Sequence, residues 1–262
     1  MLASLLFLFS VGAVAGFIAG LFGIGGGVVM VPALIFGLKV QGIDESLVIH
    51  MAIGTSLAAI AVTGASSALG HWQKGAISRD MLTRMLPGLM AGAVLGGVIA
   101  SLIQAAMLEL FFGLFLIFVA ARMMLTRMPP ASEEGASRWA MGAAGTVIGA
   151  FSALFGVGGG VLSVPWLVRS GASLKRAIGT SAACGFPIAV FGALTFVVTG
   201  LDKAALPAYA TGYLYWPAFL GMVVCSVPSA RLGVMAAHYL PSELLRRLFS
   251  LLILMIGLRL LV

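Results

Sequence analysis

The long uncharged stretches of this chain constrain its fold more than any other feature. The first runs from Met1 to Leu38, and four more of 24 to 30 residues follow at 85–108, 139–168, 177–201 and 204–230. About 20 apolar residues in a helix cross the hydrocarbon core of a bilayer, and a spanning segment must satisfy its backbone hydrogen bonds internally. Each stretch therefore predicts a membrane-embedded helix.

Three further segments, at 46–70, 107–125 and 243–262, are apolar in their centres and carry charges near their ends, where basic side chains reach the interface. The composition agrees, because 61% of the residues are hydrophobic and 9% charged, whereas soluble domains are about 25% charged. We therefore expect an all-α integral membrane protein with about eight transmembrane helices, a multi-pass protein of the cell (inner) membrane.

The second half of the chain repeats the first. The segment Gly23–Pro32 matches Gly156–Pro165 at a separation of 133 residues, and AIGTS at 52–56 returns unchanged 125 residues later at 177–181. LFFGLFLIFVAARMML at 110–125 resembles RLFSLLILMIGLRLLV at 247–262, a separation of 137. These separations are close to half the chain length, which is typical of one architecture copied once. The sequence predicts two homologous four-segment repeats, 1–126 and 139–262, joined by a linker at 127–138.

The direction of the two repeats depends on the first segment of each. An even number of crossings per half relates the copies by an axis along the membrane normal, whereas a re-entrant first segment makes the number odd and inverts them. The charged residues Lys39, Asp44 and Glu45 put the far end of the first segment in water, which favours the parallel arrangement. With parallel copies, seven basic residues fall on each side; the lack of Lys and Arg before Lys39 favours outside termini.

Two glycine-rich blocks, GLFGIGGGVVMVP at 20–32 and ALFGVGGGVLSVP at 153–165, interrupt the first segment of each half. Glycine in a helix interior costs about 1 kcal/mol relative to alanine, and the proline that follows lacks a backbone donor. In hydrocarbon, freed backbone groups are tolerated only against protein or a water-filled cavity. We therefore expect the first helix of each repeat to break at its GxGGG block, with the break facing the interior.

A broken helix inside a membrane is a candidate anion site. A helix that restarts after the break directs unpaired N–H groups and the positive end of its dipole toward a ligand, and the hydroxyls of the two AIGTS copies add donors. Close packing through glycine, and hydroxyl bonds back to the preceding turn, are the structural alternatives. The expected substrate-binding residues are Gly23, Gly25, Gly26, Gly27, Thr55, Ser56, Gly156, Gly158, Gly159, Gly160, Thr180 and Ser181.

The remaining polar residues argue against other functions. GIGGG lacks the Gly-Lys-Ser/Thr ending of a phosphate loop, and all eight acidic residues map to loops or span ends, which argues against cation transport. An intramembrane hydrolase would need a base at depth, and no histidine lies mid-span. We expect no enzymatic activity, no cofactor and no metal site. His71 is the candidate gate or proton-linked residue; the alternative is an interfacial histidine beside Trp72.

The paired blocks, each followed by AIGTS, resemble the TauE/SafE family, the sulfite exporter group, over nearly the whole chain. The resemblance implies a secondary transporter of sulfur-containing anions such as sulfite or organosulfonates, and the family label implies export. We expect alternating access around the two broken helices, with a channel-like anion pathway as the alternative. The expected partners are a small inorganic or organic sulfur anion and membrane lipids, without nucleic acid; a homodimer is compatible with the sequence.

Overall fold

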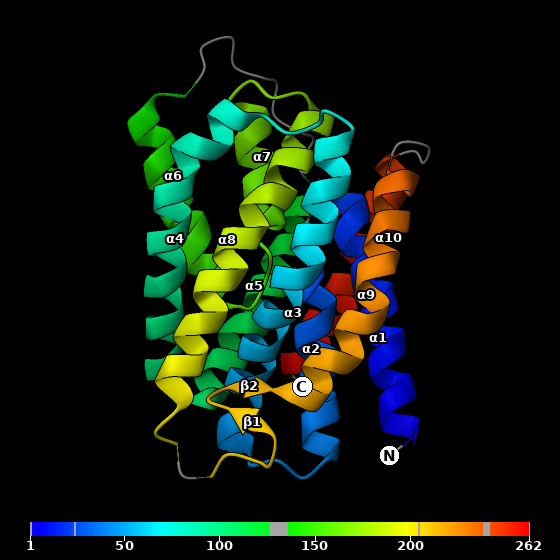
Figure 1. Ribbon diagram of the computed structural model, residues 1–262, viewed down its shortest axis with the longest axis vertical. Helices are drawn as coiled ribbons and strands as arrows, with labels where there is room; N and C mark the ends of the chain where they lie inside the picture. The colour runs from blue at the N-terminus through cyan, green and yellow to red at the C-terminus, as the bar shows by residue number, and fades with distance from the viewer. Residues whose placement is uncertain (1, 24, 126–135, 204, 238–241, 262) are drawn as a thin grey trace.

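The computed structural model describes residues 2–23, 25–125, 136–203, 205–237 and 242–261, and within them the chain is almost entirely helical (Figure 1). Five helices, α3, α4, α5, α8 and α9, are long and apolar enough to span a membrane, as a multi-pass membrane protein requires. Of the linker predicted at 127–138, residues 127–135 lie outside the described residues. In chain order the elements are α1 (Leu2–Phe22), α2 (Gly27–Val40), α3 (Glu45–Gln73), α4 (Arg79–Leu102), α5 (Ala105–Leu125), α6 (Arg138–Leu154), α7 (Gly160–Arg169), α8 (Leu174–Gly200), β1 (Ala210–Thr211), β2 (Leu214–Tyr215), α9 (Trp216–Ala236) and α10 (Ser242–Leu261).

The first uncharged stretch is not a single helix that crosses the bundle. It forms two helices, α1 and α2, and the second turns back along the first. Near the start of α1, the ring of Phe7 packs against Phe36 near the end of α2, with ring centroids 6.1 Å apart. Further along α1, the carbonyl of Ala15 lies beside Gly26, which precedes the first residue of α2. Contacts in this order require the two helices to run in opposite directions, as Figure 1 shows.

The helices on either side of the second glycine block, α6 and α7, turn back in the same way but enter the bundle from its opposite end. In Figure 1, α6 descends from the upper end and α7 returns to it. With each first segment turned back, three helices remain in each half, and an odd number inverts one half relative to the other. The parallel arrangement expected from the sequence is therefore wrong. The charges at Lys39, Asp44 and Glu45 mark an end in water, but water lies on both sides of a bilayer.

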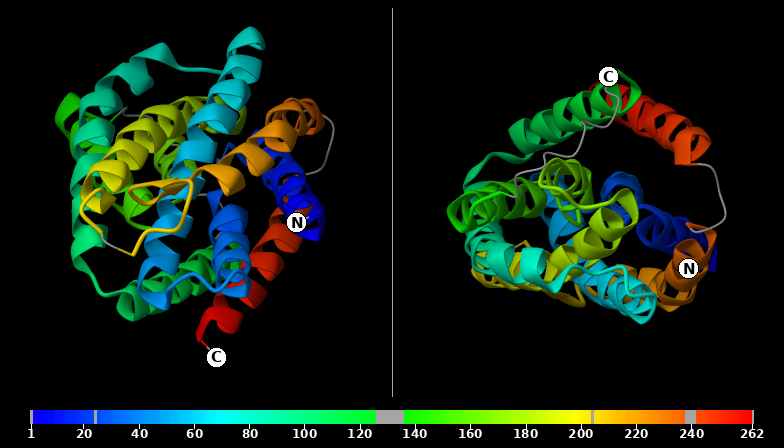
Figure 2. Two further views of the ribbon diagram at one scale, coloured as in Figure 1. Left: turned by 60° about the horizontal axis from the view of Figure 1, so that its bottom comes forward. Right: turned by 90° about the horizontal axis from the view of Figure 1, so that it is seen from above.

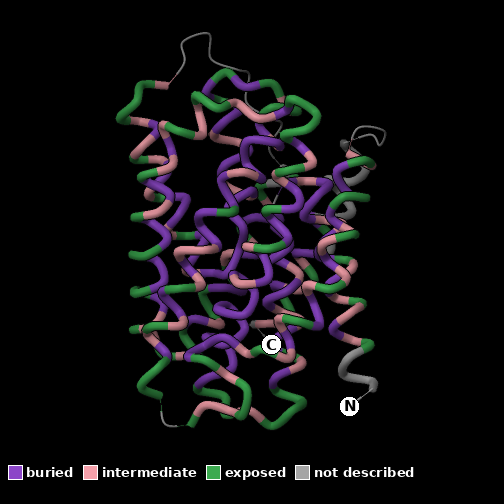
Figure 3. Tube along the Cα trace, viewed as in Figure 1, coloured by how far each residue is buried: buried purple, intermediate pink, exposed green. Residues whose placement is uncertain are grey.

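Glycines bring helices of the two halves into backbone contact. The helix pairs α1 with α9 and α4 with α6 lie on opposite sides of α3 and α8, and α3 is buried along most of its length (Figure 3). A β carbon on Gly92 would lie 2.1 Å from the carbonyl oxygen of Thr146, so only glycine permits this approach. The contacts recur every four residues, as Gly12/Met222, Gly16/Ser226 and Gly20/Ala230 in the first pair and Gly88/Gly142, Gly92/Thr146 and Gly96/Ala150 in the second.

The charge pattern predicted one membrane helix for the uncharged stretch 204–230. In the structure this stretch is not a single helix. The helix α9 begins at Trp216, and before it β1 and β2 form a short antiparallel hairpin on the end of the bundle that also bears both termini (Figure 2, left). In its turn, Tyr213 is buried and its ring stacks on His50, with centroids 5.1 Å apart. The backbone N–H of Tyr213 donates to Phe196 in α8. The backbone groups of this segment form hydrogen bonds without being part of a helix. An uncharged sequence therefore did not have to be helical here.

Basic residues gather at one end of the bundle. Because α1–α2 and α6–α7 each turn back, eleven of the described Lys and Arg residues belong to the upper end of the bundle in Figure 1, where α5 ends and α6 begins. Three, namely Lys39, Lys203 and Arg259, belong to the lower end. The sequence analysis expected seven basic residues on each side of the membrane. That expectation depended on the parallel arrangement and is wrong for the same reason. Cytoplasmic loops are enriched in Lys and Arg, so the upper end is predicted to face the cytoplasm. The eleven are Lys74, Arg79, Arg84, Arg122, Arg138, Arg169, Lys175, Arg176, Arg231, Arg246 and Arg247.

This orientation can be tested with topology reporters. We expect alkaline phosphatase fused after Val262 to be active and green fluorescent protein at the same place to be dark, because both termini then lie outside the cytoplasm. The same reporters inserted within residues 127–135 should give the opposite pattern. A fluorescent C-terminal fusion would contradict the orientation.

The glycine contacts predict which substitutions the helix pairs tolerate. Gly92→Ala should lower the free energy of unfolding by about 1 to 3 kcal/mol, because the added methyl meets the backbone of α6. Gly142→Ala, on the same helix pair, is the matched control, since a β carbon at Gly142 meets nothing within 4 Å. Thermal unfolding in detergent measures both variants, and equal melting temperatures would refute the packing account.

Candidate functional site

The two glycine blocks meet at the centre of the bundle. A β carbon on Gly25 would lie 2.7 Å from the Cα of Gly158, and one on Gly27 would lie 2.1 Å from the carbonyl oxygen of Gly156. Gly25 also has a φ of 83°, in the left-handed region that disfavours side chains. Only hydrogen atoms fit between the two backbones here. We call this meeting point, formed by Gly23, Gly25–Gly27 and Gly156–Gly160, the glycine junction.

Two helices begin at the glycine junction. Gly26 precedes α2 and Gly159 precedes α7, with φ values of 77° and 78°. The carbonyl of Gly26 accepts from the N–H groups of Val29 and Met30, and the carbonyl of Gly159 accepts in the same way from the corresponding residues of α7. The earlier N–H groups of a helix have no partner inside it and carry the positive end of its dipole. The junction therefore places two helix N-termini side by side in the interior of the bundle.

Two serines of the AIGTS segments bind the glycine blocks across the two halves. The hydroxyl of Ser56 in α3 donates to the carbonyl of Gly156 at 3.1 Å, and the hydroxyl of Ser181 in α8 donates to the carbonyl of Gly23 at 3.1 Å. All four residues are buried. Carbonyls freed by a helix break need partners inside a membrane, and each half supplies the partner for the other half.

The two threonines of these segments bind the start of a helix in the other half. The hydroxyl oxygen of Thr55 accepts from the N–H of Tyr215 at 3.0 Å, immediately before α9, and that of Thr180 accepts from Ser78 at 2.9 Å, immediately before α4. A hydroxyl that accepts keeps its own hydrogen for donation. The direct contact with substrate expected of these four hydroxyls stays a prediction, and the structure adds a role in joining the halves.

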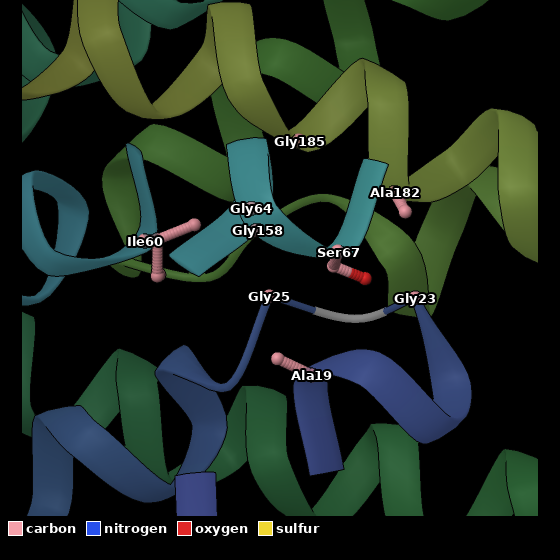
Figure 4. Close-up of a pocket in the computed structure, with 9 residues that line it drawn as sticks. All are labelled: Ala19, Gly23, Gly25, Ile60, Gly64, Ser67, Gly158, Ala182 and Gly185. Carbon is pink, nitrogen blue, oxygen red and sulfur yellow. The ribbon is translucent and has the colours of Figure 1, made fainter. Parts of the chain in front are cut away.

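A narrow crevice lies beside the glycine junction (Figure 4). Its one polar side chain is Ser67, a residue that the sequence analysis did not single out. The usable signal was its setting in TGASSALG, where a hydroxyl lies among small residues within a span. In this conformation the crevice is too narrow to hold a water molecule. It is lined by Ala19, Gly23, Gly25, Ile60, Gly64, Ser67, Gly158, Ala182 and Gly185.

His71, the candidate gate, is buried near the end of α3. Its Nε2 lies 3.3 Å from the carbonyl oxygen of Gly20, in the last turn of α1 and at the start of the first glycine block. Because a carbonyl only accepts, this hydrogen bond requires a proton on Nε2. Trp72, next in the chain, is exposed and lies 4.3 Å below the guanidinium of Arg79. His71 therefore connects α3 to the first glycine block, and its gating role stays a prediction.

The acidic residues that the structure describes lie away from the glycine junction, near the ends of helices. Among the residues whose burial the structure describes, no Asp or Glu is buried. Glu109 pairs with Lys39 at 2.9 Å near the lower end of the bundle, and Asp44 caps α3. Hydrogen bonds from Ser46 lower the pKa of the Asp44 carboxyl and keep it ionised at this helix start. The donors in the interior are thus neutral groups: backbone N–H groups and hydroxyls.

Comparison with known proteins identifies the family of this chain. The pattern of the family described as "Sulfite exporter TauE/SafE" matches residues 8–260. The chain belongs to the TauE/SafE family. The relatives below are each named a probable membrane transporter protein, and TauE/SafE membership places this chain among transporters rather than enzymes.

Three relatives illustrate the similarity. One from Haemophilus influenzae is 34% identical over 248 residues, which is 94% of each chain. One from Xylella fastidiosa is 31% identical over 255 residues, covering 94% of this chain and 90% of the relative. One from Methanocaldococcus jannaschii is 28% identical over 242 residues, covering 92% and 89%. No solved structure matches the chain.

The reciprocal serine bonds predict a matched loss of stability. Ser56→Ala and Ser181→Ala should each lower the free energy of unfolding by about 1 to 3 kcal/mol, because each leaves a buried carbonyl without its donor. Ser10→Ala is the control, since this exposed hydroxyl binds only Leu6 of its own helix. Thermal unfolding in detergent provides the comparison. If the Ser56 and Ser181 variants have the same melting temperature as the Ser10 variant, these two serines do not stabilise the junction.

Proposed function

We propose that this protein is a secondary transporter that carries sulfur-containing anions, such as sulfite or organosulfonates, by alternating access around the glycine junction. The observation that carries the proposal is the contact between Gly25 and Gly158, where two broken helices from opposite halves begin side by side. Membership of the TauE/SafE family supports the sulfur anion, and the family description supports export.

The proposed chemistry uses neutral donors to hold a negative charge. Backbone N–H groups at the first turns of α2 and α7 point along two helix dipoles whose positive ends meet at the junction. An oxyanion presents several acceptor oxygens in a small volume, which suits a cluster of N–H groups. We propose Gly23, Gly25–Gly27, Gly156 and Gly158–Gly160 as its ligands, assisted by the hydroxyls of Thr55, Ser56, Thr180 and Ser181.

The proposed movement follows from which contacts are rigid. We propose that residues 1–126 and 139–262 are two inverted repeats. The backbone contacts of α1 with α9 and of α4 with α6 leave no room for sliding, so each pair moves as one body with a helix from each repeat. Rocking of these bodies about α3 and α8 would open the closed crevice to one side and then to the other. His71, held to Gly20 at the upper end, would act as a gate on that side.

Counterflow in liposomes tests this function. Purified protein in vesicles preloaded with unlabelled sulfite should accumulate labelled sulfite transiently and saturably, and external organosulfonates should compete. A channel would carry the anion without saturable exchange. If no sulfur anion enters faster than into protein-free vesicles, the proposed function is wrong.

A pair of glycine variants tests the place of the junction in transport. Gly25→Ala should reduce sulfite flux at least about tenfold, because the added methyl meets Gly158 and Ile60. Gly42→Ala is the matched control: Gly42 has a similar φ of 73°, but a β carbon there meets nothing within 4 Å. Both variants carry the same backbone strain, so equal flux in the two would remove the junction from the mechanism.

A further inference from the structure

We propose that Ser67 is a direct substrate ligand, whose hydroxyl donates a hydrogen bond to one anion held in the crevice beside the glycine junction. The inference rests on the proposed function and extends it, because Ser67 lies outside both the GxGGG blocks and the AIGTS segments. It also implies a single site in a chain whose two halves otherwise match.

The hydroxyl of Ser67 is buried and has no hydrogen-bond partner among the described residues. The residue is 1% exposed, and none of the groups in the described part of the chain lies within hydrogen-bond distance of its Oγ. A buried hydroxyl that gives up water without a replacement costs free energy, and such groups in native proteins call for an explanation. A ligand that accepts its hydrogen supplies one.

The usual partner of a hydroxyl in a membrane helix is the carbonyl four residues earlier. Several helical hydroxyls of this chain make that bond, and Ser67 does not. Its neighbours already join α3 to α9, since Thr63 lies 2.6 Å from the hydroxyl of Ser226 and Ser66 donates to Val227 at 3.3 Å. Ser67 is therefore not needed for packing α3. Among the described residues, those that bond to the fourth preceding carbonyl include Ser10, Thr146, Ser163, Ser170, Thr195 and Thr199.

Figure 4 shows the Ser67 side chain on the crevice, with its hydroxyl directed toward the side of Gly23. The other lining side chains are Ala and Ile, which offer neither donors nor acceptors. Two residues beyond Gly25, α2 begins, so the N–H groups of its first turn lie near the same crevice. A hydroxyl and a helix N-terminus are both donors, and no carboxylate lines the crevice. This set suits an anion and disfavours a cation.

The opposite half fills the equivalent space. At the AIGTS separation of 125 residues, Ser67 corresponds to Gly192 and Ala182 corresponds to Leu57. A β carbon at Gly192 would lie 3.0 Å from Cδ1 of Leu57, so the leucine side chain occupies this position. On the side of Ser67 the smaller Ala182 takes the place of this leucine, so no side chain of that size fills the crevice. The chain therefore holds one anion and not two.

The test uses the full-length protein in proteoliposomes, with labelled sulfite as the probe. Ser67→Ala should raise the KM of counterflow about tenfold or more and leave the maximal rate within about twofold, because the anion loses a donor. Ser66→Ala, the matched control, removes a hydroxyl bonded to Val227 outside the crevice and should keep the wild-type KM. Ala182→Leu, which copies Leu57, should fill the crevice and abolish flux.

Equilibrium dialysis of sulfite separates the two claims. Wild-type protein should bind one sulfite per chain, with Ser67→Ala binding about tenfold more weakly; Ser67→Gly, which copies Gly192, serves if the alanine variant does not fold. Wild-type flux with an unchanged KM in the Ser67 variants would overturn the inference and leave the proposed function standing. Binding that depends on Ser67 without any flux would support the site and overturn transport. Two sulfites per chain would overturn the single site.

Discussion

A backbone carbonyl released inside a membrane must find a donor within the protein, and this requirement organises the whole structure. The glycine blocks release such carbonyls at Gly23 and Gly156, and the donors, Ser181 and Ser56, come from the opposite half. Neither half can complete its own broken helix. Ser56 lies on α3 and Ser181 on α8, two helices that are in contact, so this exchange of hydrogen bonds ties the central helices to both glycine blocks.

The sequence predicted the parts of this arrangement that depend on residue type. Glycine at Gly25 and Gly158 and the hydroxyls of AIGTS were identifiable because few other residues serve at a helix break. The direction of the chain after Gly26 could not be predicted, because the same glycines permit either a bend or a full reversal. That choice is made by long-range contacts such as Phe7 with Phe36. The membership of the family and the membrane class needed no such contacts.

Other features were beyond sequence reasoning for a similar reason. The hairpin before Trp216 is uncharged, so charge spacing could not separate it from α9; its backbone groups pair with each other and with Phe196. Ser67 resembles any serine in a membrane helix until the structure shows that Thr63 and Ser66 have partners and it does not. Local patterns identify chemical groups, but only the packed structure shows which of them are already in use.

The hairpin of β1 and β2 makes the two ends of the bundle unequal. Below the junction, Tyr213 stacks on His50 and contacts Phe196. The matching connection at the upper end, residues 74–78, contains no aromatic residue and meets α8 through Ala76 at Gly179 and Ser78 at Thr180. Opening the lower end must separate aromatic rings, and opening the upper end need not. In the proposed alternating access, two states that are related by near symmetry would thereby have different energies. Such a difference would give the proposed carrier unequal affinities on its two faces and a preferred resting state, with its lower end closed.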